Sequence, residues 1–269
     1  DTVPAPAALT DDSRVRSLSG DITDNALLAE AIPGDTDSIF HLAAIVSAGA
    51  EEDFELGMAV NLDATRNILE ILRQADGTPK MIFASSCAAF GGDLPNIVED
   101  MTATTPTTSY GTQKAIGELL VSDYSRRGFV DGRSLRFPTV VVRPGKPNKA
   151  ASTFASSIFR EPLQGQRAVC PVAPDAKMWL ASPRSIVENT LHAHNLAANA
   201  WGASRTVSLP GFSLTVAEMA KALENVAGPA VAGRIDWEPD PFIEKIVRGW
   251  PPAFNTKKAA ALGFTQDEG

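Results

Sequence analysis

The alternation of apolar runs with longer amphipathic segments is the feature that most constrains this chain. Residues 38–43 and 80–84 are short apolar runs, which are typical of strands buried on both faces of a parallel sheet. Between them, residues 51–74 place apolar side chains at three- and four-residue steps, which predicts a helix. A second helix and another strand follow at residues 110–127 and 134–142. This order predicts an α/β fold with a doubly wound parallel sheet.

The remaining segments predict one main domain and a smaller lobe. The alternation stops after residue 143, and a long irregular stretch follows. We expect residues 1–145 and 183–209 to build the sheet domain, and residues 146–182 and 210–269 to build the lobe. The further expected elements are strands at residues 14–18, 206–209 and 233–237, and helices at residues 25–32, 152–159, 183–200 and 216–226.

Composition and charge exclude several classes of protein. With 269 residues, of which 44% are hydrophobic, the chain can bury a sizeable core. A net charge of −8 argues against a broad surface for nucleic acid or anionic membrane. No apolar run approaches the roughly 18 to 20 residues that cross a bilayer, and residues 1–10 lack the pattern of a secretory signal. We therefore expect neither nucleic acid nor membrane as a partner.

The cysteines and histidines indicate neither a disulfide framework nor a metal site. Cys87 and Cys170 lie in apolar surroundings without CxxC spacing, which predicts buried thiols in a reducing, cytoplasmic compartment. His192 and His194 are two apart on an expected helix, so they face different sides and cannot chelate one ion together. His41 ends a buried strand, where we expect a structural role.

Tyr110 and Lys114 form the first candidate for chemistry. They are four residues apart at the start of an expected helix, so both side chains lie on one face, one turn apart. A phenol is a weak base at neutral pH, and a neighbouring ammonium favours the phenolate and brings the pKa of the phenol toward the working range. Alone the spacing is a weak motif, and a solvated helical pair is the plain alternative.

A hydroxyl ahead of this pair makes the pattern more specific. The strand at residues 80–84 leads into Ser85 and Ser86, and parallel sheets bind ligands outside the carboxyl ends of their strands. A serine there can hydrogen-bond a reacting oxygen while Tyr110 removes its proton, and an adjacent cofactor would take a hydride. The three residues together indicate oxidoreductase chemistry.

With these residues in view, the sequence resembles the extended short-chain dehydrogenase/reductases, also called NAD-dependent epimerase/dehydratases, over nearly its whole length. The likeness rests on Asn61 and on residues 20–24 (Gly-Asp-Ile-Thr-Asp), 41–44 (His-Leu-Ala-Ala), 85–91 (Ser-Ser-Cys-Ala-Ala-Phe-Gly) and 109–114 (Ser-Tyr-Gly-Thr-Gln-Lys). Residues 143–148 and 250–252 look most like the branch of the family that acts on D-erythronate. The resemblance implies a Rossmann-type sheet, NAD as cofactor and a C-terminal substrate lobe.

The resemblance also implies roles for single residues. Tyr110 would be the catalytic base, Lys114 would bind the nicotinamide ribose, and Ser86 would bind the substrate hydroxyl. Thr139 would also meet the substrate. The other cofactor-binding residues would be Asp21 and Ile22 at the adenine, Leu42, Ala43 and Ala44 along the nucleotide, Asn61, and Phe137 and Pro138 at the nicotinamide.

Two departures from the family pattern bear on these implications. The family's first strand, glycine-rich turn and first helix do not precede Asp1, so we expect a longer parent chain. Asp1 would then be the acid that binds the adenosine ribose and favours NAD over NADP. The alternative is a chain that cannot hold a dinucleotide.

The second departure concerns the substrate. Residues 139–143 read Thr-Val-Val-Val-Arg where nucleotide-sugar enzymes usually show Asn-Val-Tyr-Gly-Pro, which weakens a nucleotide-sugar assignment.

Three cations are candidates for holding a substrate carboxylate. Arg143, Lys146 and Arg184 follow strand ends or lie near the variable lobe, and a guanidinium can grip a carboxylate with two parallel bonds. Surface salt bridges are the alternative for each of them. Asn148 is a candidate for binding substrate hydroxyls by its location alone.

These observations predict an NAD-dependent dehydrogenase that oxidises the 2-hydroxyl of a small, D-erythronate-like sugar acid to a 2-keto acid, with Tyr110 as general base. Two alternatives stay open: an NAD-dependent nucleotide-sugar epimerase or dehydratase, and a non-catalytic NAD(P)-binding protein. The expected helices at residues 51–74 and 110–127 carry broad apolar stripes, and the resemblance implies that they pair across a two-fold axis in a homodimer.

Overall fold

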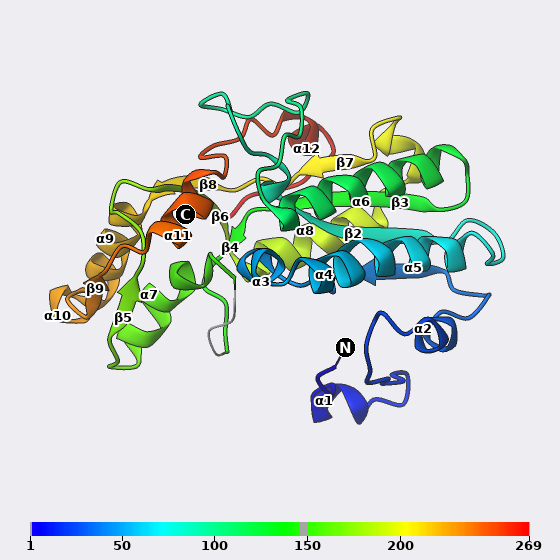
Figure 1. Cartoon of the computed structure of the whole chain (residues 1–269), viewed down its shortest axis with the longest axis horizontal. Coiled ribbons are helices and arrows are strands. Elements are labelled where there is room, and N and C mark those ends of the chain that lie inside the picture. Colours follow the sequence, from blue (N-terminus) through cyan, green and yellow to red (C-terminus); the bar gives the residue numbers. More distant parts are fainter. Residues whose placement is uncertain (1, 146–149, 269) are drawn as a thin grey trace.

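A four-stranded parallel sheet with strand order β1–β2–β3–β7 forms the centre of the larger part of the molecule (Figure 1). The computed structural model describes residues 2–145 and 150–268. The four strands are β1 (Ser38–His41), β2 (Lys80–Ser86), β3 (Asp131–Phe137) and β7 (Thr206–Ser208). The α/β fold predicted from the sequence is confirmed.

Helices cover both faces of this sheet, which explains why its strands are apolar without alternation. Met81 and Phe83 of β2 share a buried cluster with α5 and α6, and Ile82 between them shares another with α8 and α12. These helices are α5 (Ala64–Leu72), α6 (Ser109–Arg126), α8 (Pro183–Asn195) and α12 (Lys257–Ala261). Before them come α1 (Ala7–Thr10) and α2 (Asn25–Ala31), drawn at the bottom of Figure 1.

A smaller lobe with its own core lies beside the carboxyl ends of the strands (Figure 1). Phe154, Met178 and Met219 belong to this core. Its strands are β4 (Thr139–Val140), β5 (Ala168–Cys170), β6 (Lys177–Ala181), β8 (Phe212–Thr215) and β9 (Ile235–Trp237), in sheets β4–β6–β8 and β5–β9. Its helices are α7 (Thr153–Leu163), α9 (Val216–Ala227), α10 (Pro229–Ala232) and α11 (Pro241–Arg248). Sequence reasoning missed β5, β6 and β8, which are only three to five residues long.

Four expected elements differ from the structure. Residues 14–18 are not a strand, because no strand among the described residues pairs with them. The expected helix at 51–74 begins earlier and is divided, because Asp53 ends one helix and its side chain caps the next. The divided parts are α3 (Ser47–Glu52), α4 (Phe54–Gly57), a π-helical turn (Met58–Asp63) and α5.

The third difference is the strand expected at residues 134–142. It begins at Asp131 and breaks at Pro138, which has no N–H to donate to a strand ladder. Beyond the break, β4 pairs with β6 of the lobe instead of continuing the main sheet. The chain thus turns from the sheet into the lobe directly beside the end of β2. The helix expected at 183–200 likewise stops at Asn195, before a short 3-10 turn (Ala198–Trp201).

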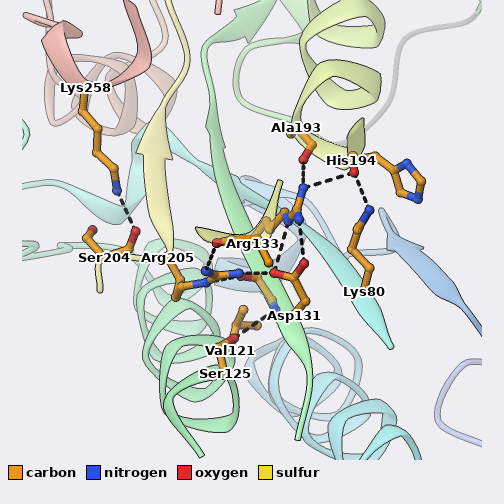
Figure 2. A network of polar contacts seen from close by, with 12 residues as sticks. Lys80, Val121, Ser125, Asp131, Arg133, Ala193, His194, Ser204, Arg205 and Lys258 are labelled. Carbon is orange, nitrogen blue, oxygen red and sulfur yellow. Dashed lines mark hydrogen bonds and ion pairs between the residues drawn. The ribbon is translucent and has the colours of Figure 1, made fainter. Parts of the chain in front are cut away.

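A buried polar network ties the amino end of the sheet to α8 (Figure 2). Asp131, the first residue of β3, forms ion pairs with Arg133, at 2.5 Å, and with Arg205. The Arg133 guanidinium also donates to the carbonyl oxygens of Ala193 and His194 at the end of α8. Lys80 Nζ donates to the His194 carbonyl at 2.6 Å. Cations thus satisfy helix-end carbonyls that have no partner within the helix.

Candidate active site

The carboxyl ends of β1, β2 and β3 border a pocket of about 250 Å³. Parallel strands end at the same edge of a sheet, so residues that follow each strand meet there. The break at Pro138 brings the start of the lobe over this edge. The lining residues that the sequence singled out are Leu42, Ala44, Ser86, Tyr110, Lys114, Phe137, Pro138, Thr139 and Arg143.

The start of α6 delivers Tyr110 and Lys114 to this pocket. Thr108 caps the helix, its Oγ1 accepting the Gly111 N–H at 3.1 Å. A Cβ on Gly111 would lie 2.0 Å from the Ala88 carbonyl oxygen, so glycine is what lets the helix approach the segment that follows β2. The Lys114 Nζ lies 5.7 Å from the centre of the Tyr110 ring and 4.9 Å from that of Phe83.

Ser86 joins them from the last position of β2. Its Oγ accepts the Ala88 N–H at 3.1 Å and so caps a short 3-10 turn (Cys87–Ala89). The Ser86 side chain is also close enough to the Tyr110 phenol to lower its pKa. The structure therefore brings the strand-end serine, the tyrosine and the lysine into one site.

The electrostatics of the pair differ from the sequence-based expectation. Burial raises the pKa of Tyr110 to about 12, while the Ser86 side chain and the charge of Arg143 lower it in part. Burial also lowers the pKa of Lys114 to about 8, and Glu118 raises it in part. Desolvation thus outweighs the neighbouring charges, and the cation that favours the phenolate is Arg143 instead of Lys114.

Arg143 offers the pocket a guanidinium without a carboxylate partner among the described residues. Its backbone is fixed from two sides: its N–H donates to Ser156 Oγ at 2.9 Å, and Arg160 Nη1 donates to its carbonyl at 2.9 Å. Burial and the charge of Arg160 lower the pKa of Arg143, although a guanidinium stays protonated at neutral pH. A positioned, unpaired guanidinium is suited to bind an anion.

Other candidate residues lie away from this pocket. The Asn61 amide exchanges hydrogen bonds with the backbone of Ile45, at 2.8 and 2.9 Å, and so holds the segment after β1. Asp21 lies at the surface, Ile22 packs on the core under α5, and neither Ala43 nor Arg184 lines the pocket. The roles expected of these residues stay predictions. Asp1, Lys146 and Asn148 lie outside the described residues.

Several lining residues were not assigned from the sequence. Ser47 begins α3, and its Oγ accepts the Ala151 N–H at 3.1 Å, which joins the sheet domain to the lobe. No motif marks this serine, because its position depends on how the two parts pack. The other unassigned lining residues are Val46, Ala84, Ser85, Cys87, Ala88, Val140 and Ala150. Ser152, a candidate for substrate hydroxyls by location, and Trp250, a candidate wall of the pocket, also line it.

His41 and the cysteines contribute to the core. The His41 Nε2 lies 2.8 Å from Thr65 Oγ1, and burial together with the charge of Lys114 lowers the pKa of His41 to about 3. Cys87 and Cys170 are buried free thiols, as the sequence predicts.

Within residues 2–145 and 150–268, no group of three or more His, Cys, Asp or Glu side chains is placed to hold a metal ion. In the same ranges, no helix has the length and apolarity that a bilayer span needs.

The pocket also fits part of a nicotinamide nucleotide. Phe137 and Pro138 give it an apolar wall, Ala44 leaves room for close approach to the backbone, and Lys114 supplies an ammonium. Lys114 is only 1% exposed. No carboxylate in the part of the chain that the structure describes forms an ion pair with its ammonium group. Ribose hydroxyls are suitable partners for such a donor.

Comparisons with known proteins show the family to which this chain belongs. The profile of the NAD dependent epimerase/dehydratase family matches residues 2–179. D-erythronate dehydrogenase of Cupriavidus necator is 56% identical over 98% of this chain and 82% of its own length. The Haemophilus influenzae enzyme of the same name is 50% identical over 98% of this chain and 84% of its own. A crystal structure described as a nucleoside-diphosphate-sugar epimerase from Agrobacterium tumefaciens is 47% identical, with a TM-score of 0.90 over 99% of this chain and 79% of that one.

Proposed function

This chain belongs to the NAD-dependent epimerase/dehydratase family and is an NAD-dependent dehydrogenase, and on that premise we propose that it oxidises the 2-hydroxyl of a small sugar acid to a 2-keto acid. The substrate is of the D-erythronate kind. The observation that carries this proposal is the convergence on one pocket of Ser86, Tyr110, Lys114 and Arg143, which has no carboxylate partner among the described residues.

Each residue has a defined part in the proposed reaction. Tyr110 takes the proton of the 2-hydroxyl, and Ser86 holds the reacting oxygen by a hydrogen bond. The bound cofactor supplies the acceptor for the hydride that leaves C2, so the alcohol carbon becomes a carbonyl carbon. Lys114 donates to ribose hydroxyls and keeps positive charge near the phenol. Because burial raises the pKa of Tyr110 to about 12, proton removal depends on the groups that favour the phenolate, Ser86 and Arg143.

Arg143 distinguishes a sugar acid from a neutral alcohol. A carboxylate next to the reacting carbon would meet the guanidinium while its 2-hydroxyl meets Ser86 and Tyr110, because all three line the same pocket of about 250 Å³. The charge of Arg143 therefore supports an acid as the class of substrate.

Initial rates with four- and five-carbon sugar acids, each with NAD and with NADP, test this proposal. We expect net NADH formation with an acid of the D-erythronate type. Cofactor recycling on UDP- or dTDP-sugars without net NADH would instead favour an epimerase or dehydratase. Binding of NAD without turnover of any of these compounds would leave a non-catalytic dinucleotide-binding protein.

Two arginine variants refine the assignment. Replacing a bidentate charged contact with a neutral side chain costs about 1.5 to 3 kcal/mol, so Arg143→Gln should raise the KM for the acid roughly 10- to 100-fold. Arg184→Gln is the control, because Arg184 does not line the pocket. An equal effect of both variants would remove Arg143 from substrate recognition.

We also expect a homodimer that pairs the helices of residues 51–74 and α6 with their copies. Phe54 and Leu56 of α4 and Leu119 of α6 are large apolar side chains exposed on these helices. Light scattering at micromolar concentration checks this expectation, and a monomeric mass would contradict it.

A further inference from the structure

Three buried polar side chains form a cluster directly behind the candidate active site. The Glu118 carboxylate accepts hydrogen bonds from Ser85 Oγ at 2.5 Å and from Arg136 Nε and Nη2 at 2.8 and 2.6 Å. The Glu118 and Arg136 side chains are 6% and 11% exposed. The Arg136 guanidinium also lies over the Phe90 ring, 4.5 Å from its centre. Glu118 and Arg136 thus form an ion pair inside the fold, and Ser85 donates a further hydrogen bond to the Glu118 carboxylate.

Each member of this cluster adjoins a residue of the pocket. Ser85 precedes Ser86 on β2, and Arg136 precedes Phe137 on β3. The two strands are in register here, with Ser85 opposite Arg136 and Ser86 opposite Phe137. Glu118 lies one turn after Lys114 on α6. The cluster therefore joins the three elements that carry the serine, the lysine and the nicotinamide-facing wall.

Glu118 is also the nearby negative charge for Lys114. The ionisable groups that act on or beside this ammonium are Tyr110 and Glu118 from α6 and His41 from β1. Of these, only Glu118 is a carboxylate, and its attraction raises the pKa of Lys114 against the opposing effect of burial. The balance holds the pKa of Lys114 at about 8, so most of this ammonium is charged at neutral pH.

We propose that Glu118, fixed by Arg136 and Ser85, is a positioning residue that keeps Lys114 in its ammonium form and holds α6 against the ends of β2 and β3. This inference deepens the proposed function and rests on Lys114 acting there as a cation. Glu118 itself does not line the pocket. Its contribution reaches the reaction through Lys114 and through the placement of Ser86 and Tyr110.

The test compares Glu118→Gln with Asp131→Asn as a matched control. Both variants remove one buried carboxylate charge paired with arginine, but Asp131 lies at the amino end of the sheet. If the pKa of Lys114 falls by about one unit, kcat/KM of Glu118→Gln relative to the wild type falls about 10-fold at pH 9 but less than about 2-fold at pH 6. Asp131→Asn should show no such pH-dependent ratio, and Glu118→Asp should recover part of the activity.

A double variant tests the same proposal if Glu118→Gln folds poorly. Replacing a buried ion pair by apolar residues of similar volume is often neutral for stability, so Glu118→Leu/Arg136→Met removes both charges without leaving Arg136 unpaired. We expect the double variant to show the same pH-dependent loss. A ratio to the wild type that is constant from pH 6 to pH 9 in both variants would overturn the proposal.

A third measurement requires no turnover. The NMR signal of ¹³C-methylated Lys114 should titrate about one pH unit lower in Glu118→Gln than in the wild type. An unchanged titration would overturn the inference about Glu118 even if the sugar acid is oxidised. A shifted titration without oxidation of any acid would overturn only the proposed function.

Discussion

The two ends of the central sheet differ in how their buried cations are satisfied, because two cations at the carboxyl end, beside the Arg136–Glu118 pair, have no ion-pair partner among the described residues. At the amino end, Asp131 pairs with Arg133 and Arg205, and backbone carbonyls accept from Arg133 and Lys80 (Figure 2). At the carboxyl end, Lys114 and Arg143 border the pocket, and neither forms an ion pair with any carboxylate in the described ranges. Matched charges join elements of the fold, whereas unmatched cations are available for a ligand.

Because of this difference, we expect substitutions at the two ends of the sheet to affect stability and activity separately. Asp131 and Phe137 are the two ends of β3, a strand that spans roughly 20 Å at about 3.3 Å per residue. Substitutions that far apart without shared partners usually act independently. Variants at the amino end should therefore change unfolding, and variants in the pocket should change turnover.

The largest effect is expected for Asp131→Ala. This change leaves the buried Arg133 and the largely buried Arg205 without their carboxylate, which costs about 3 to 5 kcal/mol of unfolding free energy. Urea denaturation measures the loss. Asp123→Ala is the control, because its ion pair with Arg126 is exposed and contributes less than about 1 kcal/mol. If Asp131→Ala lowered kcat of the folded protein instead, the separation of the two ends would be wrong.

A smaller effect, mainly on activity, is expected for Tyr110→Phe. Removing the phenol oxygen takes away the proposed general base, so kcat should fall at least about 10²-fold, or about 2.7 kcal/mol. The unfolding free energy should change by less, by no more than about 1.5 kcal/mol, which is the upper range for one hydrogen-bonding group. Tyr124→Phe is a matched control, because that hydroxyl hydrogen-bonds Glu70 at the contact of α5 and α6. Activity that survived Tyr110→Phe would exclude the mechanism.

The sequence predicts the carboxyl end better than the amino end. Ser86, Tyr110 and Lys114 can be placed together because strand ends converge and helical residues four apart share a face. The Asp131 network cannot be predicted in this way, since Arg205 lies 74 residues from Asp131 and no spacing rule connects them. The same holds for Glu118 and Arg136, which only the packing of α6 on β3 brings into contact.

The predicted boundaries of helices and strands were wrong where a single residue interrupts a periodic pattern. The apolar spacing of residues 51–74 predicts an unbroken helix, yet the Asp53 side chain prefers to cap α4. The apolar run at 134–142 predicts one strand, yet Pro138 lacks the donor that a central strand needs. The break at Pro138 turns the chain beside the pocket, so this deviation from regular structure shapes the site.

The smallest expected effect is a pH dependence of stability from His41, at the carboxyl end. Its imidazole is buried beside Lys114, which lowers its pKa from 6.5 to about 3. The unfolded chain therefore takes up a proton below about pH 6.5 that the folded chain refuses until about pH 3, and stability falls as the pH decreases through this window. At pH 5 the loss amounts to about 2 kcal/mol relative to neutral pH.

The comparison variant for this effect is His41→Gln. Thr65 Oγ1 donates to the Asn61 carbonyl at 2.8 Å, so the His41 Nε2–H must be the donor to Thr65, and a glutamine amide retains a donor there. Denaturation at pH 7 and pH 5 should show that the wild type loses about 2 kcal/mol more than His41→Gln. Equal losses would mean that His41 titrates normally in the folded protein. Burial and the positive charge of Lys114 would then not lower the pKa of His41, and the contrast between the two ends of the sheet would be weaker than the contacts indicate.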